Sequence, residues 1–134
     1  MSFSIAQAAR RSGLSVDTLR YYERIGLVDP PGRDSGGRRS YTEADLAWLE
    51  FLTKLRTTGM PIRQMLEYTA ARRLGIAGVG RRRDILVERR DAVVAHIAEL
   101  QSCLETLNYK IDNYTVVESK MPPAAESAAQ EASA

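Results

Sequence analysis

The sequence predicts a mainly α-helical protein in which a winged helix-turn-helix head precedes a long coiled-coil helix. Three observations predict this fold. Residues 4–25 have the pattern of two short helices joined by a glycine turn, and residues 27–41 have the glycine and arginine content of a basic hairpin. Residues 81–117 contain a heptad repeat and neither Pro nor Gly. A length of 134 residues suits one domain with an appendage.

Two helices are predicted at the start of the chain from their caps and apolar spacing. The first spans residues 4–11, with Ser4 as its N-cap, and the second follows the N-cap Ser15. The second helix ends near residue 25, because Gly26 readily adopts the left-handed conformation that stops a helix. Its run of Arg20, Tyr21 and Tyr22 cannot be buried completely, and guanidinium and phenol donors suit phosphate oxygens.

The segment 27–41 predicts a short β-hairpin with a basic tip, which is a wing. The turn signal Ser35-Gly36-Gly37 is flanked by Arg33 on one side and by Arg38 and Arg39 on the other. The alternative is a surface loop in which the arginine pair occurs by chance.

Two further helices and a joint complete the head. A helix begins at Thr42 and ends at Gly59, and Pro61 starts another helix that runs to about residue 73. The glycines within residues 75–80 then predict a flexible joint.

A heptad seam runs along the last helix and predicts a dimerisation surface. Its positions, spaced by seven residues or by four and three, are Leu86, Val93, Ile97, Leu100, Leu104, Leu107, Ile111 and Tyr114. The rest of the chain is too short to bury this stripe, so a partner helix is expected, and the pattern allows a parallel or an antiparallel pair. The predicted organisation is a head over 1–75, a hinge over 76–82, a coiled-coil helix over 82–117 and a disordered tail over 118–134.

Charge and composition restrict the class of protein. Residues 1–83 hold 15 Lys and Arg against 8 Asp and Glu, whereas residues 84–134 hold 4 against 9. This division fits a polyanion-binding head on a separate assembly module, although two ordinary solvated surfaces are the alternative. A single cysteine excludes an internal disulfide framework, and no apolar run approaches the ~20 residues of a membrane span. We therefore expect a cytoplasmic protein that has no membrane partner.

With these elements in this order, the chain resembles the MerR family of bacterial transcription regulators. The motifs that carry the resemblance are Ser4–Ala9, Gly13–Leu27, Gly37–Tyr41 and Leu55–Ile62, in the order and spacing of the family. The likeness covers residues 2–117 and implies a winged helix-turn-helix head with an antiparallel coiled-coil homodimer. It also implies binding to double-stranded DNA at a pseudo-palindromic promoter, whose spacer the dimer distorts so that RNA polymerase can use it.

The resemblance also assigns roles by matched position. Backbone contacts fall on Arg20, Tyr21 and Tyr22, and the start of the recognition helix, where base edges and phosphates are reached, holds Ser15, Asp17 and Thr18. Asp17 departs from the basic or polar residue common there, and a carboxylate favours a cytosine amino group over a phosphate. The first wing is matched by Arg38, Arg39 and Tyr41, and Arg63 lies near the second wing.

Other functions are less well supported by the residues. One His and one Cys leave no catalytic set, so an enzyme is not expected, and no cofactor is implied. The paired cysteines of the family's metal sensors are absent, which indicates a small, metal-independent branch without a metal site. The alternative function is an architectural or excisionase-like DNA-bending protein that does not activate polymerase. The residues do not identify a small-molecule inducer.

Overall fold

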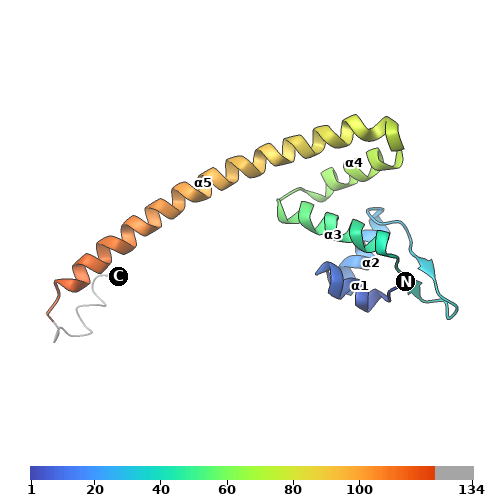
Figure 1. Ribbon diagram of the computed structural model, residues 1–134, viewed down its shortest axis with the longest axis horizontal. Coiled ribbons are helices and arrows are strands. Elements are labelled where there is room, and N and C mark those ends of the chain that lie inside the picture. The colour runs from blue at the N-terminus through green and yellow to red at the C-terminus, as the bar shows by residue number, and fades with distance from the viewer. Residues whose placement is uncertain (123–134) are drawn as a thin grey trace. The chain divides into compact units, whose positions relative to one another are not determined.

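Helices make up most of the structure, which is a computed structural model describing residues 1–122, and a small two-stranded wing interrupts them (Figure 1). This confirms the predicted mainly helical fold. The elements of the head are α1 (Ile5–Ser12), α2 (Val16–Ile25), β1 (Gly32–Arg33), β2 (Arg39–Ser40), α3 (Glu43–Thr57), α4 (Ile62–Arg73) and the 3-10 helix η1 (Gly75–Gly78). The long helix α5 (Val79–Ser119) follows, and its first turns, to Asp91, belong to the same compact unit as the head.

The predicted caps fix the ends of α1 and α2. Ser4 Oγ accepts a hydrogen bond from the Gln7 amide at 3.2 Å, and the Gln7 side chain accepts one from the Ser4 amide at 2.8 Å. This reciprocal arrangement satisfies two amide groups that the first turn of α1 leaves free. At the end of α2, Gly26 has a φ angle of 90°, and its amide donates to carbonyls of the last turn. The glycine therefore stops α2 as predicted.

The core of the head forms around α3, which contributes one buried leucine per turn. Leu49 and Leu52 are fully buried, and the indole Nε1 of Trp48 donates to the Leu27 carbonyl at 2.9 Å. Tyr68 of α4 stacks on Trp48 with ring centroids 6.1 Å apart. The helix-turn-helix, the start of the wing and α4 therefore share one hydrophobic core.

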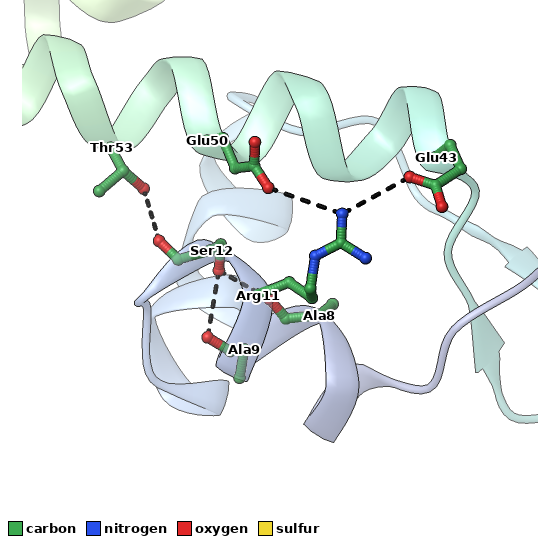
Figure 2. Close-up of polar contacts among 7 residues, drawn as sticks. All are labelled: Ala8, Ala9, Arg11, Ser12, Glu43, Glu50 and Thr53. Carbon is green, nitrogen blue, oxygen red and sulfur yellow. Dashed lines mark hydrogen bonds and ion pairs between the residues drawn. The ribbon is translucent and has the colours of Figure 1, made fainter.

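Polar contacts fasten the end of α1 to α3 (Figure 2). The Thr53 hydroxyl of α3 donates to the Ser12 carbonyl at 3.3 Å, and the buried Ser12 hydroxyl donates to the Ala8 carbonyl at 2.8 Å. The Arg11 guanidinium lies 3.6 Å from Glu43 and 4.0 Å from Glu50. These two ion pairs are long and exposed, and the Thr53 hydroxyl shares its one proton with the nearer Leu49 carbonyl at 2.9 Å, so the hydrophobic core carries most of the attachment.

The expected flexible joint at residues 75–80 is helical instead. The 3-10 helix η1 occupies its first four residues, and α5 begins at Val79. Glycine is needed at position 78 for packing, because a Cβ atom there would lie 1.8 Å from the Ala71 carbonyl oxygen of α4. Sequence reasoning assigned this glycine to flexibility, whereas its missing side chain allows a close approach between two backbones.

The start of α5 completes the core of the head. Ile85 is 1% exposed, and Leu86 packs against the core as a partly buried residue. Leu86 was predicted to belong to the dimerisation seam. Part of its surface packs against the head, and its place in the seam stays a prediction. The first seam position therefore directly follows Ile85, a residue that the head buries.

The part of α5 beyond Asp91 leaves its apolar side chains uncovered. Val93 is partly buried, and the other predicted seam residues from Ile97 to Tyr114 are each between 50% and 59% exposed. The helix continues to Ser119, two residues beyond the predicted end of the coiled coil. Most of the predicted tail, residues 123–134, lies outside the described residues.

Candidate nucleic-acid interface

One face of α2 presents an exposed row of polar and aromatic side chains. Arg20 and Tyr21 each lie three or four residues from Asp17 and from Arg24, so the four share this face, and all four are exposed. The Arg24 guanidinium lies over the Tyr21 ring, 5.5 Å from its centroid. This cation–π contact orients the guanidinium and the phenol together, and both can donate to phosphate oxygens.

The start of α2 is held by hydroxyl groups. Ser15 Oγ accepts from the Thr18 amide at 3.0 Å and donates to the Thr18 hydroxyl at 2.9 Å. Ser15 therefore caps the helix, and any contact with DNA would be additional to this role. Asp17 lies in the first turn, where a carboxylate interacts favourably with the helix dipole. This interaction is a structural reason for an acidic residue at position 17, where the family commonly has a basic or polar one.

The wing is an antiparallel hairpin with a tightly hydrogen-bonded tip. Gly32 pairs with Ser40 and Arg33 with Arg39, which confirms the predicted hairpin. At the tip, Asp34 Oδ1 accepts hydrogen bonds from the amides of Gly36, at 2.9 Å, and Arg38, at 3.0 Å. The side chain of Arg38 is exposed, so the tip carries a cation as expected.

A two-bond ion pair joins the wing to α2. Arg39 Nε donates to Glu23 Oε1 at 3.1 Å, and Arg39 Nη2 donates to Glu23 Oε2 at 3.0 Å. The hydrogen bond from Arg39 holds the pKa of the Glu23 carboxyl below its usual value, and the nearby Arg33 charge lowers this pKa further. Arg39 was predicted to contact DNA, but two of its guanidinium nitrogens already donate to Glu23 within the head.

Two tyrosines that were predicted to contact DNA belong to the core. Tyr22 is 4% exposed and Tyr41 is 3% exposed, and burial raises the pKa of both phenols. Tyr22 lies on the face of α2 that packs inward with Leu19, one residue away from the exposed Tyr21. Tyr41 exchanges two backbone hydrogen bonds of 2.8 Å with Phe3. Their rings therefore pack the helix-turn-helix against the base of the wing.

The remaining predicted contact, Arg63, lies away from this group in the sequence and on another helix. It is exposed in the first turn of α4, where it lines a hollow with Gln64, Arg81 and Arg89. Arg81 forms an ion pair of 3.0 Å with Glu67 across this hollow. The Glu23–Arg39 pair joins α2, which carries Arg20 and Tyr21, to the wing, whereas Arg63 lines a hollow formed by residues of α4 and α5.

Three residues of this region were not among the predicted DNA contacts. Arg24 follows Arg20 by four residues, and this helical spacing could have revealed it. Arg33 donates from Nη1 to the Gly37 carbonyl at 3.1 Å and stiffens the wing, which the hairpin pattern alone does not predict. Glu23 had no local signal, because its partner Arg39 is sixteen residues further along the chain.

The fold and this face define a winged helix-turn-helix protein of the DNA-binding class. Residues 3–72 match the family described as "MerR HTH family regulatory protein". The chain belongs to the MerR family, as its motifs indicated, and it is a DNA-binding transcription regulator.

The sequence similarity to known regulators extends beyond the head. The HTH-type transcriptional regulator AdhR of Bacillus subtilis is 41% identical over 91 residues, which are 68% of this chain and 65% of that protein. The chain thus spans slightly less than two thirds of the length of AdhR. An uncharacterized HTH-type transcriptional regulator of Haemophilus influenzae is 34% identical over 114 residues, which are 85% of this chain and 84% of that protein.

Solved structures of the family have the same fold. HiNmlR, described as a MerR family regulator lacking the sensor domain and bound to promoter DNA, superposes with a TM-score of 0.83 at 31% identity. The match covers 91% of this chain and 98% of that one. A putative MerR family transcriptional regulator from Listeria monocytogenes has a TM-score of 0.80 at 35% identity, over 88% of this chain and 91% of that one. Within residues 1–122, no helix is long and apolar enough to cross a membrane.

Proposed function

We propose that this regulator acts in the cytoplasm as a homodimer, by binding rather than by catalysis. Each head binds one half of a pseudo-palindromic promoter, and the dimer distorts the spacer between the halves to control transcription by RNA polymerase. The observation that carries this proposal is the junction of an exposed basic face on α2 with a basic wing. The HiNmlR structure supports it, because that relative is bound to promoter DNA.

The proposed backbone contacts are the exposed donors of α2 and the wing. Arg20, Tyr21 and Arg24 lie on one face of α2, and Arg38 extends from the wing tip. Guanidinium and phenol donors at two separate elements can contact phosphates on both sides of a groove and fix the register of the head on the duplex. Ser15 and Thr18, at the start of α2, are the proposed groups nearest to the base edges.

The proposed dimer forms through the seam of α5, in the antiparallel orientation. Residues 81–90 hold five Arg against two acidic residues, whereas residues 105–119 hold three acidic residues against one Lys. An antiparallel pair brings each basic end to the acidic end of the other copy, while a parallel pair would bring like charges together. Charge therefore selects between two orientations that the apolar pattern leaves equal.

A mobility-shift titration of the full chain on DNA from upstream of its own gene tests the proposal. We expect tight binding that weakens steeply as salt rises, because phosphate contacts release counterions. The variant Arg20→Ala should weaken binding to all sequences and reduce the salt slope by about one. Lys54→Ala, which removes an exposed cation on α3, is the matched control and should leave both unchanged.

Spacer distortion is measured separately, with 2-aminopurine placed in the spacer between the half-sites. Fluorescence should rise on binding if bases unstack, and transcription from the same fragment with purified polymerase should change with the regulator. Absence of binding at low salt would exclude the proposal. Binding with distortion but no effect on transcription would favour a DNA-bending protein without a regulatory role.

A further inference from the structure

The ion pair between Glu23 and Arg39 connects the two elements that carry the proposed phosphate donors. Glu23 belongs to α2 and Arg39 to β2, and their two hydrogen bonds measure 3.1 and 3.0 Å. The Arg39 side chain is 25% exposed and that of Glu23 is 20% exposed, so water screens this pair less than it screens the open ion pairs of Arg11. A planar guanidinium on a planar carboxylate fixes orientation as well as distance.

The charges of this pair do not favour attraction to DNA. Glu23 is a carboxylate held in its charged form on the helix that carries Arg20 and Tyr21. Its negative charge repels phosphate, and it uses two guanidinium nitrogens that Arg39 could otherwise offer to the duplex. The pair therefore reduces the attraction for a polyanion, and any gain that it brings to binding has to come from geometry.

The other contacts of the wing hold its two ends. At the end of the hairpin, Tyr41 bonds to Phe3 through two backbone hydrogen bonds of 2.8 Å. Before the hairpin, Arg73 Nη2 donates to the Gly26 carbonyl and to Asp29 Oδ1, both at 2.9 Å. Between these anchors, the wing could rotate about its base. The Glu23–Arg39 pair, whose arginine lies two residues before Tyr41 in the chain, adds a side-chain link from β2 to α2 that would restrain such a rotation.

We propose that Glu23 and Arg39 are positioning residues, which set the distance and angle between the wing and α2. In this arrangement Arg38 on the wing and Arg20 on α2 reach their phosphates at the same time, and Arg39 is not itself a phosphate contact. The inference rests on the DNA-binding function proposed above. It assigns to Arg39 a role different from the one that the family motif implies.

The variant Glu23→Gln tests this role through the sign of its effect. Removing a negative charge from a phosphate-binding face should tighten binding if electrostatic attraction alone matters. Positioning predicts the opposite, a loss of about three- to tenfold in affinity together with a weaker 2-aminopurine signal. Glu50→Gln removes a carboxylate from α3 that lies 4.0 Å from Arg11, and as the control it should not weaken binding.

A second variant separates positioning from direct contact. Arg39→Lys keeps the positive charge but cannot form the two-bond pair, so positioning predicts a loss similar to that of Glu23→Gln. Because both variants break the same contact, the double variant should be no weaker than either single variant. Additive losses, or a loss confined to the Arg39 variant, would overturn the inference in favour of a phosphate contact.

Amide hydrogen exchange of the free protein provides a readout that needs no DNA. The Asp34 amide bonds to the Arg38 carbonyl at 2.9 Å across the hairpin, and its exchange should accelerate in both variants but not in the Glu50 control. Unchanged exchange and unchanged or tighter DNA binding in Glu23→Gln would reject the positioning role. Failure of the wild-type protein to bind DNA would instead reject the proposed function, and exchange would still report whether the pair holds the wing.

Discussion

The head buries its apolar side chains, whereas the part of α5 beyond Asp91 leaves them exposed. In the head, Leu49 and Leu52 are completely buried within one chain, whereas Leu104 and Leu107 of α5 are 55% and 58% exposed. The head can therefore gain its hydrophobic stabilisation alone. The distal helix can gain it only from another surface, so its stability is expected to depend on protein concentration.

The largest effect is expected from Leu52→Ala, which tests whether the head is self-sufficient. Removing a fully buried leucine should lower the free energy of unfolding by about 2–5 kcal/mol, through lost burial and a cavity. Trp48 is the single tryptophan and contacts the core, so its fluorescence during denaturant unfolding follows the head. Leu74→Ala, at a residue that is 65% exposed, should change stability little.

The second prediction concerns the seam. If α5 pairs with a second copy, Leu104→Ala should weaken the dimer by about ten- to a hundredfold, measured by sedimentation equilibrium. The unfolding of the head, followed at high dilution by Trp48 fluorescence, should not change. Ser102→Ala, at an exposed position outside the seam, is the control. A wild-type protein that sediments as a monomer at micromolar concentration would contradict the contrast between the two regions.

A pair of glycine variants tests the backbone at the end of α2 and near the start of α5, which both belong to the compact unit of the head. Gly26→Ala should destabilise the head by about 1–2 kcal/mol, because the φ angle of 90° that ends α2 is strained for alanine. Gly80→Ala lies within α5, where φ is ordinary and an added Cβ meets no atom within 4 Å. This change should stabilise the protein by about 0.5–1 kcal/mol. Thermal unfolding of both variants measures the two changes in stability. Changes of the same sign would contradict the different backbone roles of the two glycines.

The smallest effect is expected from acid titration of the head. The pKa of Glu23 in the folded protein lies below its ordinary value of 4.5, because Arg39 donates hydrogen bonds to the charged form. Its contribution to stability is therefore complete above pH 4.5 and is lost as pH falls through the lower, folded pKa. The stability difference between the wild type and Glu23→Gln should shrink over that range. If the stability difference between the two proteins stays constant down to strongly acidic pH, the charged form of Glu23 does not stabilise the head.

Signals confined to a few neighbouring residues predicted most of the fold. Ser4, Ser15 and Gly26 predicted helix ends, because a cap depends on residues within one turn. The glycine turn of the wing and the heptad seam are patterns of the same local kind. The head, the hairpin and the long helix could therefore be predicted in order, with ends correct to within a few residues.

Features that depend on distant residues could not be predicted in this way. Helical spacing from Leu19 places Tyr22 rather than Tyr21 on the inward face of α2, but the packing of α2 on the core decides that Tyr22 is almost completely buried. From the sequence, Arg39 is expected to be a free cation of the wing, because Glu23, its partner in the folded protein, lies sixteen residues away in the chain. Gly78 carries a local signal of flexibility, although the backbone of α4 is what makes a side chain impossible there.

The hydrogen bonds of Asp34 at the wing tip have a consequence for the entropy of DNA binding. Because its carboxylate already holds the amides of Gly36 and Arg38, the tip loses its conformational freedom when the protein folds. Little further ordering is then required when the wing meets a duplex, so more of the energy of each phosphate contact remains as affinity. The same carboxylate brings a negative charge close to Arg38, and the wing therefore trades some long-range attraction for preorganisation.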